Sequence, residues 1–223
     1  MLKAFGAKFS SSVLLFNCSP RKDRNTMHIL KEVKRGAESK GANVEIYNLY
    51  SMKFKGCCSC LECKKRGQPA GCTMKDNLTP ILEKVDQCDG FAIGTPLYMH
   101  NFAASFYPFF ERLIYSHLTY NPARKVKTAR KINTGLIITG GINKERYEKE
   151  TWPLHVHEKN YLDTTYGPCK LISSINLCLT PDPTPYDMQG FNMEQIHKWV
   201  KDHDAEILEQ AFEMGVHLTT KRN

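Results

Sequence analysis

Residues 12–26 read SVLLFNCSPRKDRNT, and this stretch decides the fold class. The apolar run Ser12–Phe16 is typical of a buried strand. It passes through a polar loop into a helix that we expect to begin at about Thr26 and to end in the region Gly36–Gly41. A strand followed at once by an amphipathic helix is the repeating unit of a parallel sheet covered by helices. The stretch therefore predicts an α/β fold.

The same alternation continues along the chain. Further strands are expected at Val44–Leu49, Gly90–Gly94, Gly135–Thr139 and Leu171–Leu179, and further helices at 78–85, 102–114 and 193–216. Loops are expected at Pro153 and across Pro181, Pro183 and Pro185. Five parallel strands with helices on both faces make a three-layer, doubly wound sheet. Its flavodoxin-like strand order, 2-1-3-4-5, places a ligand between the loops that follow the first and third strands.

Length and composition favour a single domain over residues 1–223, with residues 1–11 as a poorly ordered lead-in. A hydrophobic fraction of 41% is enough to bury a core. No apolar segment is long enough for a signal peptide or a membrane span, so we expect a cytoplasmic protein with no membrane partner. The net charge is +8, but the basic run at residues 124–131 lacks interleaved aromatic residues that could stack on bases, so no nucleic-acid partner is expected.

The loop after the first strand carries residues that can hold a phosphate. A helix N-terminus offers backbone N–H groups and the positive end of the helix dipole to an anion. Ser19 and Thr26 add hydroxyl donors, and Asn25 adds an amide. Arg21 adds a guanidinium whose two parallel donors suit a phosphate. The alternative is that Asn25 or Thr26 only caps the helix. The loop matches neither the Walker pattern nor the dinucleotide-binding glycine pattern.

The loop after the third strand carries residues that can hold a flat ring. It runs from Thr95 through Pro96, Leu97 and Tyr98 to Asn101. Pro96 stiffens the backbone, and Leu97 and Tyr98 can present a flat apolar surface. Alone, the segment is equally compatible with an ordinary proline turn. Its pairing with the phosphate-type loop favours a ligand that has both a phosphate and a flat ring, because the two loops form two walls of one crevice.

A third wall of this crevice is expected at Thr139, Gly140 and Gly141, where the glycines let a ligand approach the backbone closely. The whole set comprises Ser19-Pro20-Arg21 with Asn25-Thr26, Gly94-Thr95-Pro96-Leu97-Tyr98, Glu111-Arg112 and Thr139-Gly140-Gly141. It resembles the NADPH-dependent FMN reductase and iron–sulfur flavoprotein branch of the flavodoxin-like superfamily. The resemblance covers residues 13–141.

The resemblance implies a bound FMN, with NAD(P)H as co-substrate and a homodimer or homotetramer as the assembly. It assigns Ser19, Arg21, Asn25 and Thr26 to the FMN phosphate, and Pro96, Leu97 and Tyr98 to the flavin ring. Two positions depart from the family pattern. Arg24 stands where many members have glycine, and Pro108 is expected to interrupt a helix that is normally continuous and carries a lysine near Phe106.

Five of the nine cysteines fall between Cys57 and Cys72, in the loop after the second strand. Cys57, Cys60 and Cys63 recur at intervals of three, and Cys72 can fold back as a fourth ligand. Four converging thiolates suit a [4Fe–4S] cluster or a zinc ion. Iron–sulfur flavoproteins resemble this arrangement, although their last gap is usually shorter than the one from Cys63 to Cys72. The resemblance favours a cluster over zinc. Many cluster-free relatives also keep cysteines in this loop, which leaves a loop without metal as the alternative.

Other polar, sulfur and aromatic side chains are expected to have mostly structural roles. His155 and His157 are expected on the surface or in a substrate lid. The aromatic run from Phe106 to Tyr115 is wider than one helix face needs for a core, and part of it is expected to form a subunit interface. The remaining structural cysteines are expected to be buried: Cys18, Cys88, Cys169 and Cys178.

Three functions compete on this evidence. The leading hypothesis is an FMN-dependent oxidoreductase in which NAD(P)H reduces the flavin and the flavin then reduces an acceptor, so that no side-chain acid or base is required. The second is an iron–sulfur flavoprotein that transfers electrons and uses the cysteine-bound cluster as a relay. The third is a metal-stabilised binding module. Quinones, nitroaromatics, metal ions and proteins are all compatible acceptors for the first.

Overall fold

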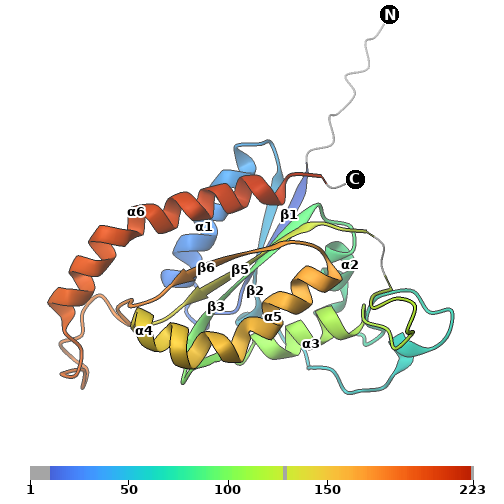
Figure 1. Ribbon diagram of the computed structural model, residues 1–223, viewed down its shortest axis with the longest axis horizontal. Coiled ribbons are helices and arrows are strands. Elements are labelled where there is room, and N and C mark those ends of the chain that lie inside the picture. Colours follow the sequence, from blue (N-terminus) through green and yellow to red (C-terminus); the bar gives the residue numbers. More distant parts are fainter. Residues whose placement is uncertain (1–10, 128–129, 222–223) are drawn as a thin grey trace, which may run out of the picture.

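The chain folds into a central sheet with helices on both faces (Figure 1). The computed structural model describes residues 11–127 and 130–221. The strands are β1 (Ser12–Asn17), β2 (Asn43–Asn48), β3 (Gly90–Tyr98), β4 (Asn101–Phe102), β5 (Asn133–Thr139) and β6 (Cys169–Ser174). The helices are α1 (Asn25–Glu38), α2 (Thr79–Val85), α3 (Phe106–Tyr115), α4 (Lys144–Arg146), α5 (Trp152–Thr165) and α6 (Met193–Leu218). A π-helical turn, Tyr147–Thr151, joins α4 to α5.

The five long strands are parallel and lie in the order β2-β1-β3-β5-β6. This is the predicted flavodoxin-like order, and the doubly wound α/β fold is confirmed. The sequence did not predict β4, a short antiparallel addition that pairs with the end of β3. The strand order reverses at β1 and β3, so the loops that leave these two strands flank the crevice in which such sheets bind ligands.

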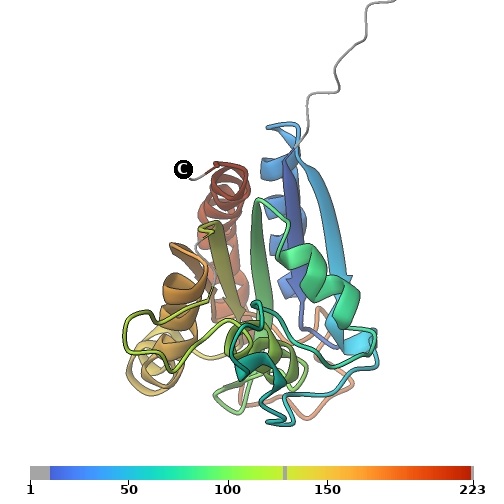
Figure 2. The ribbon, with the colours of Figure 1, turned by 90° about the vertical axis from the view of Figure 1, so that its right-hand side faces the viewer.

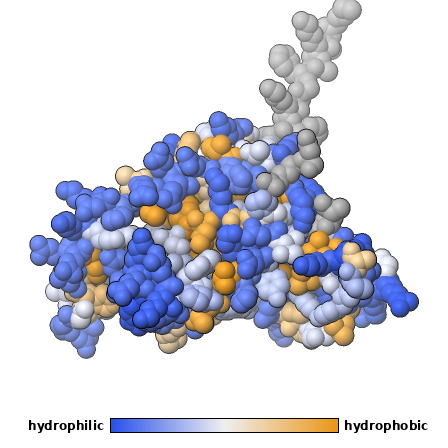
Figure 3. Space-filling model, in the orientation of Figure 1, coloured by the Kyte–Doolittle hydropathy of each residue, from blue (hydrophilic) through white to orange (hydrophobic). Residues whose placement is uncertain are grey.

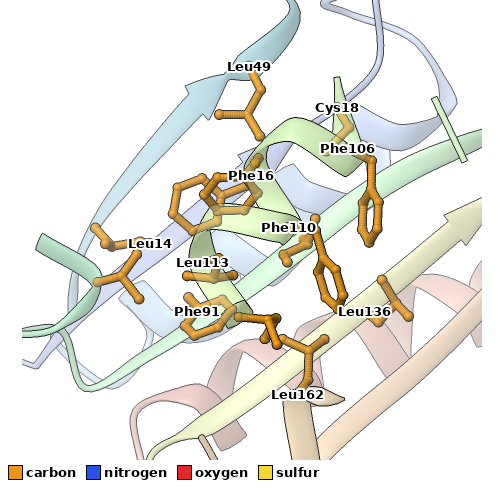
Figure 4. Packing of buried hydrophobic residues seen from close by; sticks show 14 of the residues in the cluster. Leu14, Phe16, Cys18, Leu49, Phe91, Phe106, Phe110, Leu113, Leu136 and Leu162 are labelled. Atoms are coloured by element: carbon orange, nitrogen blue, oxygen red, sulfur yellow. The ribbon is translucent and has the colours of Figure 1, made fainter. Parts of the chain in front are cut away.

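The sheet lies between two helical layers (Figure 2). Alternate side chains of a strand point to opposite faces, and β1 shows this directly. Val13 and Leu15 pack with residues of α1 and α6, whereas Leu14 and Phe16 pack with residues of α2, α3 and α5. Figure 4 shows this second core, in which Phe16 packs with Phe91 and, further along α3, Phe106 stacks on Phe110. Burial on both faces is what keeps the strands' carboxyl ends in fixed positions.

Glycines allow α1 and α6 to approach closely. A Cβ atom at Gly36 would lie 2.0 Å from the backbone oxygen of Phe212, and one at Gly215 would lie 2.0 Å from that of Val33. The first helix ends at Glu38, inside the predicted region Gly36–Gly41, so this prediction is confirmed. Gly36 is a packing position, while Gly41, with a φ of 77°, follows the helix end.

Two strands differ in length from their predictions. β3 continues to Tyr98, so Thr95–Tyr98 are strand residues and not a loop. β6 ends at Ser174, so the expected strand over 171–179 is wrong beyond this point. Asn176 has a φ of 58°, and its backbone N–H donates to the Ile142 carbonyl oxygen at 2.8 Å, which turns the chain towards the loop after β5.

Two prolines also differ from their predictions. Pro153 was expected in a loop, but it lies in the first turn of α5, where a missing N–H costs no helical hydrogen bond. Pro108 does not interrupt α3, because the helix begins at Phe106 and its first N–H groups have no partner within the helix in any case.

The surface seen in Figure 3 is mostly polar, with a few small apolar patches. Within residues 11–127 and 130–221, no helix is long and apolar enough to cross a membrane. The expected lead-in, residues 1–11, falls almost entirely outside the described residues. Part of the basic run supports the fold, because Lys131 donates to the Thr164 carbonyl oxygen at 2.9 Å and Arg130 to that of Asp86 at 3.1 Å.

Candidate functional site

A hollow lies at the carboxyl edge of the sheet, between the loops that follow β1, β3, β5 and β6. Ten of the positions predicted from sequence line it: Ser19, Arg21, Asn25, Thr26, Pro96, Leu97, Tyr98, Thr139, Gly140 and Gly141. Arg24 and Leu179 complete the lining. We call this the flavin hollow, after the ligand expected there.

Hydrogen bonds fix the loop between β1 and α1. The side chain of Asn17 accepts from the Ser19 backbone N–H at 3.0 Å, and the Ser19 hydroxyl accepts from the Arg21 backbone N–H at 3.1 Å. Arg24 occupies the N-cap position of α1, and no side chain caps the helix there. The first N–H groups of α1 are therefore left to an anion at this end of the helix, where the dipole favours one.

Two buried hydroxyl groups meet at the wall of the flavin hollow. Thr26 and Thr139 are each about 2% exposed, and their Oγ1 atoms are 2.8 Å apart. Gly94 makes room for this contact, since a Cβ there would lie 2.8 Å from the Thr26 methyl carbon. The pair joins the start of α1 to the end of β5, so a buried hydrogen bond links two walls of the hollow.

The ring side of the hollow is a strained β-hairpin formed by β3 and β4. Its two turn residues, Met99 and His100, have φ values of 50° and 64°, a region that favours Gly, Asn or Asp. Each costs on the order of 1–2 kcal/mol in this conformation. Met99 is 90% exposed and gains nothing from burial, so the hairpin must be held by other contacts. Backbone strain of this kind clusters at functional sites.

His155 holds the hairpin from α5. Its Nε2–H donates to the His100 carbonyl oxygen at 2.7 Å, and its ring stacks on Phe102 with centroids 4.0 Å apart. His100 Nδ1 lies 2.7 Å from the Thr151 hydroxyl in the π-helical turn. His155 is 2% exposed, so its predicted place on the surface is wrong, while His157 is exposed. Local sequence patterns carry no sign of this contact, because the two histidines lie 55 residues apart.

A carboxylate accompanies His155 in the interior. Glu158 Oε1 lies 3.7 Å from His155 Nδ1, and Nδ1 itself has no hydrogen-bond partner among the described residues. Burial alone would lower the pKa of His155, but the Glu158 carboxylate and the His100 carbonyl raise it above the ordinary value. The charged imidazole is therefore favoured at the position that holds the hairpin.

The segment after β6 closes the flavin hollow on the side of the phosphate loop. The Arg21 guanidinium donates to the Leu179 carbonyl oxygen, and Asn25 Nδ2 donates to that of Cys178 at 3.2 Å. This wall was missed because the sequence predicted a strand through Leu179. Cys178, expected to be buried, is only half-buried, whereas Cys18, Cys88 and Cys169 are buried as predicted.

Thr95 and Asn101 do not line the flavin hollow. Thr95 is fully buried, and its hydroxyl accepts from the Ala103 backbone N–H at 3.2 Å. Asn101 is exposed, and its side chain donates to the Met99 carbonyl oxygen at 3.1 Å. Both residues shape the hairpin rather than the inner wall.

A second hollow lies in the loop after β2, against α3. All four cysteines predicted as ligands line it: Cys57, Cys60, Cys63 and Cys72. It shares no lining residue with the flavin hollow. Cys58 does not line it. Ser59 and Leu61 have φ values of 52° and 59°, so the sign of φ alternates along this turn. Such alternation points successive N–H groups into one concavity that favours an anion. We call this the cysteine hollow.

Residues 111 and 112 of α3 clamp both ends of the cysteine loop. Glu111 Oε2 accepts from the Cys57 backbone N–H at 3.0 Å. A Cβ at Gly56 would lie 2.7 Å from this oxygen. Arg112 donates to Asp76 Oδ2 at 2.5 Å and to the Lys55 carbonyl oxygen at 3.2 Å. The helix that begins beside the flavin hollow therefore shapes the cysteine hollow.

Two lysines hold the middle of the cysteine loop. Lys64 Nζ donates to the carbonyl oxygens of Tyr115 and Leu118, the second at 2.8 Å. Lys127 Nζ donates to the carbonyl oxygens of Cys63 and Gln68, the second at 3.0 Å. Both ammonium groups are bound by neutral oxygens here, so their charges are not cancelled by these contacts.

The aromatic run of α3 is mostly core. Phe106, Phe109 and Phe110 are no more than 8% exposed, so these three rings belong to the core. The expectation that part of the run forms a subunit interface stays a prediction. Tyr107 and Tyr115 are half-buried.

The model of one known family matches this chain. The NADPH-dependent FMN reductase family matches residues 11–148, which include the loops after β1, β3 and β5 and the whole cysteine loop. The chain belongs to this family. Residues 149–221, which carry α5, β6 and α6, lie beyond the match.

Relatives of this FMN reductase family member include proteins named iron–sulfur flavoproteins. It is 35% identical over 89 residues to an iron–sulfur flavoprotein of Archaeoglobus fulgidus, which is 40% of this chain and 42% of that protein. It is 26% identical over 139 residues to an iron–sulfur flavoprotein of Methanosarcina thermophila, which is 62% of this chain and 70% of that one. The first match thus spans less than half of the relative's length.

Solved structures share the fold. The NAD(P)H:quinone oxidoreductase from Methanothermobacter marburgensis superposes with a TM-score of 0.67 at 15% identity, over 96% of this chain and all of that one. A likeness at this identity bears on the fold and not on the reaction.

The donor sets of this family member fit the two groups that the family and its relatives suggest. The uncapped N-terminus of α1, with the hydroxyl, amide and guanidinium donors around it, fits the phosphate of FMN. In the described part of the chain, no three His, Cys, Asp or Glu side chains come close enough to hold one metal ion. The four thiols that line the cysteine hollow are the residues that would hold a metal centre.

Proposed function

We propose that this protein is an FMN-dependent oxidoreductase in which NAD(P)H reduces bound FMN and an electron acceptor then reoxidises it. The flavin hollow carries the proposal. It lies at the carboxyl edge where the strand order reverses, and phosphate donors and a flat hairpin wall face it from neighbouring loops. Bound FMN would supply the chemistry by accepting a hydride and giving up electrons.

The chain's own residues bind and orient the cofactor. Ser19, Arg21, Asn25 and Thr26 would hold the phosphate, and Pro96, Leu97 and Tyr98 would hold the ring. Thr139, Gly140 and Gly141 would form the wall between these two groups. The ring-side wall is rigid because His155 and Thr151 hold the tip of the hairpin. Rigid walls fix the ring's orientation before any donor arrives, and this is the part of the reaction that a protein can accelerate.

Stopped-flow mixing tests this reaction directly. FMN-loaded protein is mixed anaerobically with NADPH and, separately, with NADH. Bleaching of the flavin absorbance with either donor, followed by recovery on adding a quinone, supports the proposal. Stable flavin absorbance with both donors would remove the reductase function, whichever acceptor is supplied. The same experiment measures the nicotinamide preference.

A second candidate function is electron transfer through a [4Fe–4S] cluster on Cys57, Cys60, Cys63 and Cys72. The observation that favours it is the single hollow that all four thiols line. The two relatives described above are also named iron–sulfur flavoproteins. Ser105, at the start of α3, donates to the Cys18 carbonyl oxygen, and Arg112 on the same helix lines the cysteine hollow. At a rise of 1.5 Å per residue, Ser105 and Arg112 lie about 10 Å apart along the helix axis.

The cysteine loop contains its own matched control. In anaerobically purified protein, Cys60→Ser should abolish bound iron and sulfide, whereas Cys58→Ser should leave both at the level of the unmodified protein. Both thiols are exposed and lie two residues apart, but only Cys60 lines the hollow. Equal iron content in the two variants would contradict the assignment of these ligands, and absence of iron in the unmodified protein would remove the second function.

We also propose a homodimer or homotetramer as the assembly. The buried rings of α3 cannot supply the interface, but half-buried Tyr107 and Tyr115 remain available. Sedimentation velocity of the FMN-loaded protein distinguishes monomer, dimer and tetramer.

A further inference from the structure

Arg112 is the largest fully buried side chain among the described residues. The residue is 1% exposed and its side chain is 0% exposed. A buried guanidinium is costly unless its charge is paired and its donors are hydrogen-bonded. Its surroundings should therefore account for one charge and five N–H groups.

The protein accounts for only part of this group. Nη1 donates to Asp76 and to the Lys55 carbonyl oxygen, and Nη2 donates to the Met74 carbonyl oxygen at 3.3 Å. Nε is buried and has no hydrogen-bond partner in the described part of the chain. Leaving a buried donor unsatisfied costs about 1–3 kcal/mol, and such groups in native proteins usually have a partner or a role.

The cysteine hollow lies beside this unsatisfied donor. Arg112 lines the hollow together with the four thiols. Cysteine sulfurs are among the acceptors that line the hollow beside the guanidinium.

Charge around the hollow points the same way. Lys64 and Lys127 add two ammonium groups bound to carbonyl oxygens, while Asp76 and Glu111 are the carboxylates in the clamp. Among the described residues that line the hollow, Arg112 is the one cation and Glu111 the one anion. A guanidinium beside the four thiols is suited to make charge-assisted hydrogen bonds to thiolates around a metal centre.

We propose that Arg112 compensates the negative charge of a thiolate-bound cluster in the cysteine hollow, with Nε–H donating to a ligand sulfur. The inference rests on the second proposed function. Hydrogen bonds to ligand sulfurs and the net charge around them set the potential of iron–sulfur centres. Arg112 therefore raises the midpoint potential of the centre and slows the loss of iron. It is a positioning residue, because it acts through the cysteines.

Three variants of the holoprotein test this role. Arg112→Gln removes the charge and the Nε donor, and Arg112→Lys keeps the charge but removes the Nε donor. Arg146→Gln is the matched control, since Arg146 is an exposed residue of α4 paired only with Glu150 in the described contacts. Each is purified anaerobically and checked by circular dichroism and FMN content. The readouts are the midpoint potential from an EPR redox titration and the rate at which a chelator removes iron.

Arg112→Gln should shift the midpoint to a more negative potential and lose iron about 10- to 100-fold faster, the usual effect of removing a partner of a metal ligand. Arg112→Lys should keep the potential but also lose iron faster, and Arg146→Gln should match the unmodified protein in both. A role limited to tying loop ends predicts an unchanged potential in Arg112→Gln.

The failures can be told apart. If the unmodified protein binds no iron, the second proposed function fails and the inference fails with it. If the unmodified protein binds iron but both Arg112 variants keep its potential and its rate of iron loss, only the inference is overturned. If Arg112→Gln does not fold, Arg112→Lys decides, because iron loss at the unmodified rate overturns the inference.

Discussion

The flavin hollow and the cysteine hollow are built in different ways. The flavin hollow is formed by short segments at the ends of β1, β3 and β5, and hydroxyl groups, backbone N–H groups and glycines make most of its walls. The cysteine hollow is formed by a long loop whose regular elements are two 3₁₀ turns, Leu49–Ser51 and Glu62–Lys64. Long charged side chains hold that loop to α3 and to its own carbonyl oxygens.

The difference shows where the stability of each site comes from. The sheet and its two cores fix the flavin hollow, so a single side chain there should affect the ligand more than the fold. A few clamps fix the cysteine hollow, so loss of one clamp should loosen the whole loop. Variants in the flavin hollow should therefore change ligand affinity more than stability, whereas variants in the clamps of the cysteine hollow should change stability.

Asp76→Ala should lower the free energy of unfolding by about 3 kcal/mol, because it leaves the buried Arg112 charge without its carboxylate. Urea unfolding measures the change. Glu150→Ala is the matched control: it breaks the exposed pair with Arg146, and about 0.5 kcal/mol or less is expected. A loss in Asp76→Ala no larger than the control's would show that the clamp does not hold the loop.

The same carboxylate predicts acid sensitivity. Burial alone would raise the pKa of Asp76, but hydrogen bonds from Arg112 and from the Leu78 and Lys55 backbone N–H groups lower it below the ordinary value. A carboxyl group with a lowered pKa in the folded protein stabilises it above about pH 4, and this contribution is lost as the pH falls through the lowered value. Unfolding curves between about pH 6 and pH 2 should show this loss in the unmodified protein and a flatter dependence in Asp76→Asn.

Arg21→Ala should weaken FMN binding about 10- to 100-fold, the loss of one charge-assisted hydrogen bond to phosphate, and leave the free energy of unfolding nearly unchanged. Fluorescence titration of the apoprotein measures the affinity. Lys22→Ala is the control, because Lys22 is exposed, adjacent in sequence and absent from the lining. Equal weakening in both variants would indicate general electrostatic attraction and not a phosphate site.

His155→Leu should weaken FMN binding by about fivefold, because the strained hairpin loses the donor to the His100 carbonyl oxygen. His155→Gln keeps an N–H donor and should restore most of the affinity. The raised pKa of His155 gives a second signature. Its charged form stabilises the fold fully below about pH 6.5, and this contribution is lost as the pH rises through the raised value. The difference in thermal stability between the unmodified protein and His155→Gln should therefore shrink as the pH rises. A difference that does not change with pH would contradict a stabilising role for the charged form of His155.

Local sequence predicted most of the fold and the sides of the flavin hollow. The strand order and the loops after β1, β3 and β5 follow from short-range patterns, and the structure brings ten of the predicted positions together. Their role in binding FMN stays a prediction. The helix over Trp152–Thr165 was missed because Pro153 looks like a loop signal unless it falls in the first turn.

Contacts between distant residues could not be predicted. His155 meets His100 only because α5 packs across the hairpin, and Arg112 meets Asp76 and Lys55 only because the cysteine loop folds back on α3. Nothing in the local pattern around these residues carries a signal for such contacts. The segment after β6 was missed for the same reason. A strand was expected there, but the chain turns at Asn176 and Leu179 then contacts Arg21 at the wall of the flavin hollow.

The central claim is that the loop between β1 and α1 binds the phosphate of FMN. Titration of the apoprotein with FMN and with riboflavin tests it most directly, because the two ligands share the ring and differ in the phosphate. The account predicts that FMN binds at least about 100-fold more tightly, since two or more charge-assisted hydrogen bonds are at stake. Equal affinities for FMN and riboflavin would contradict it.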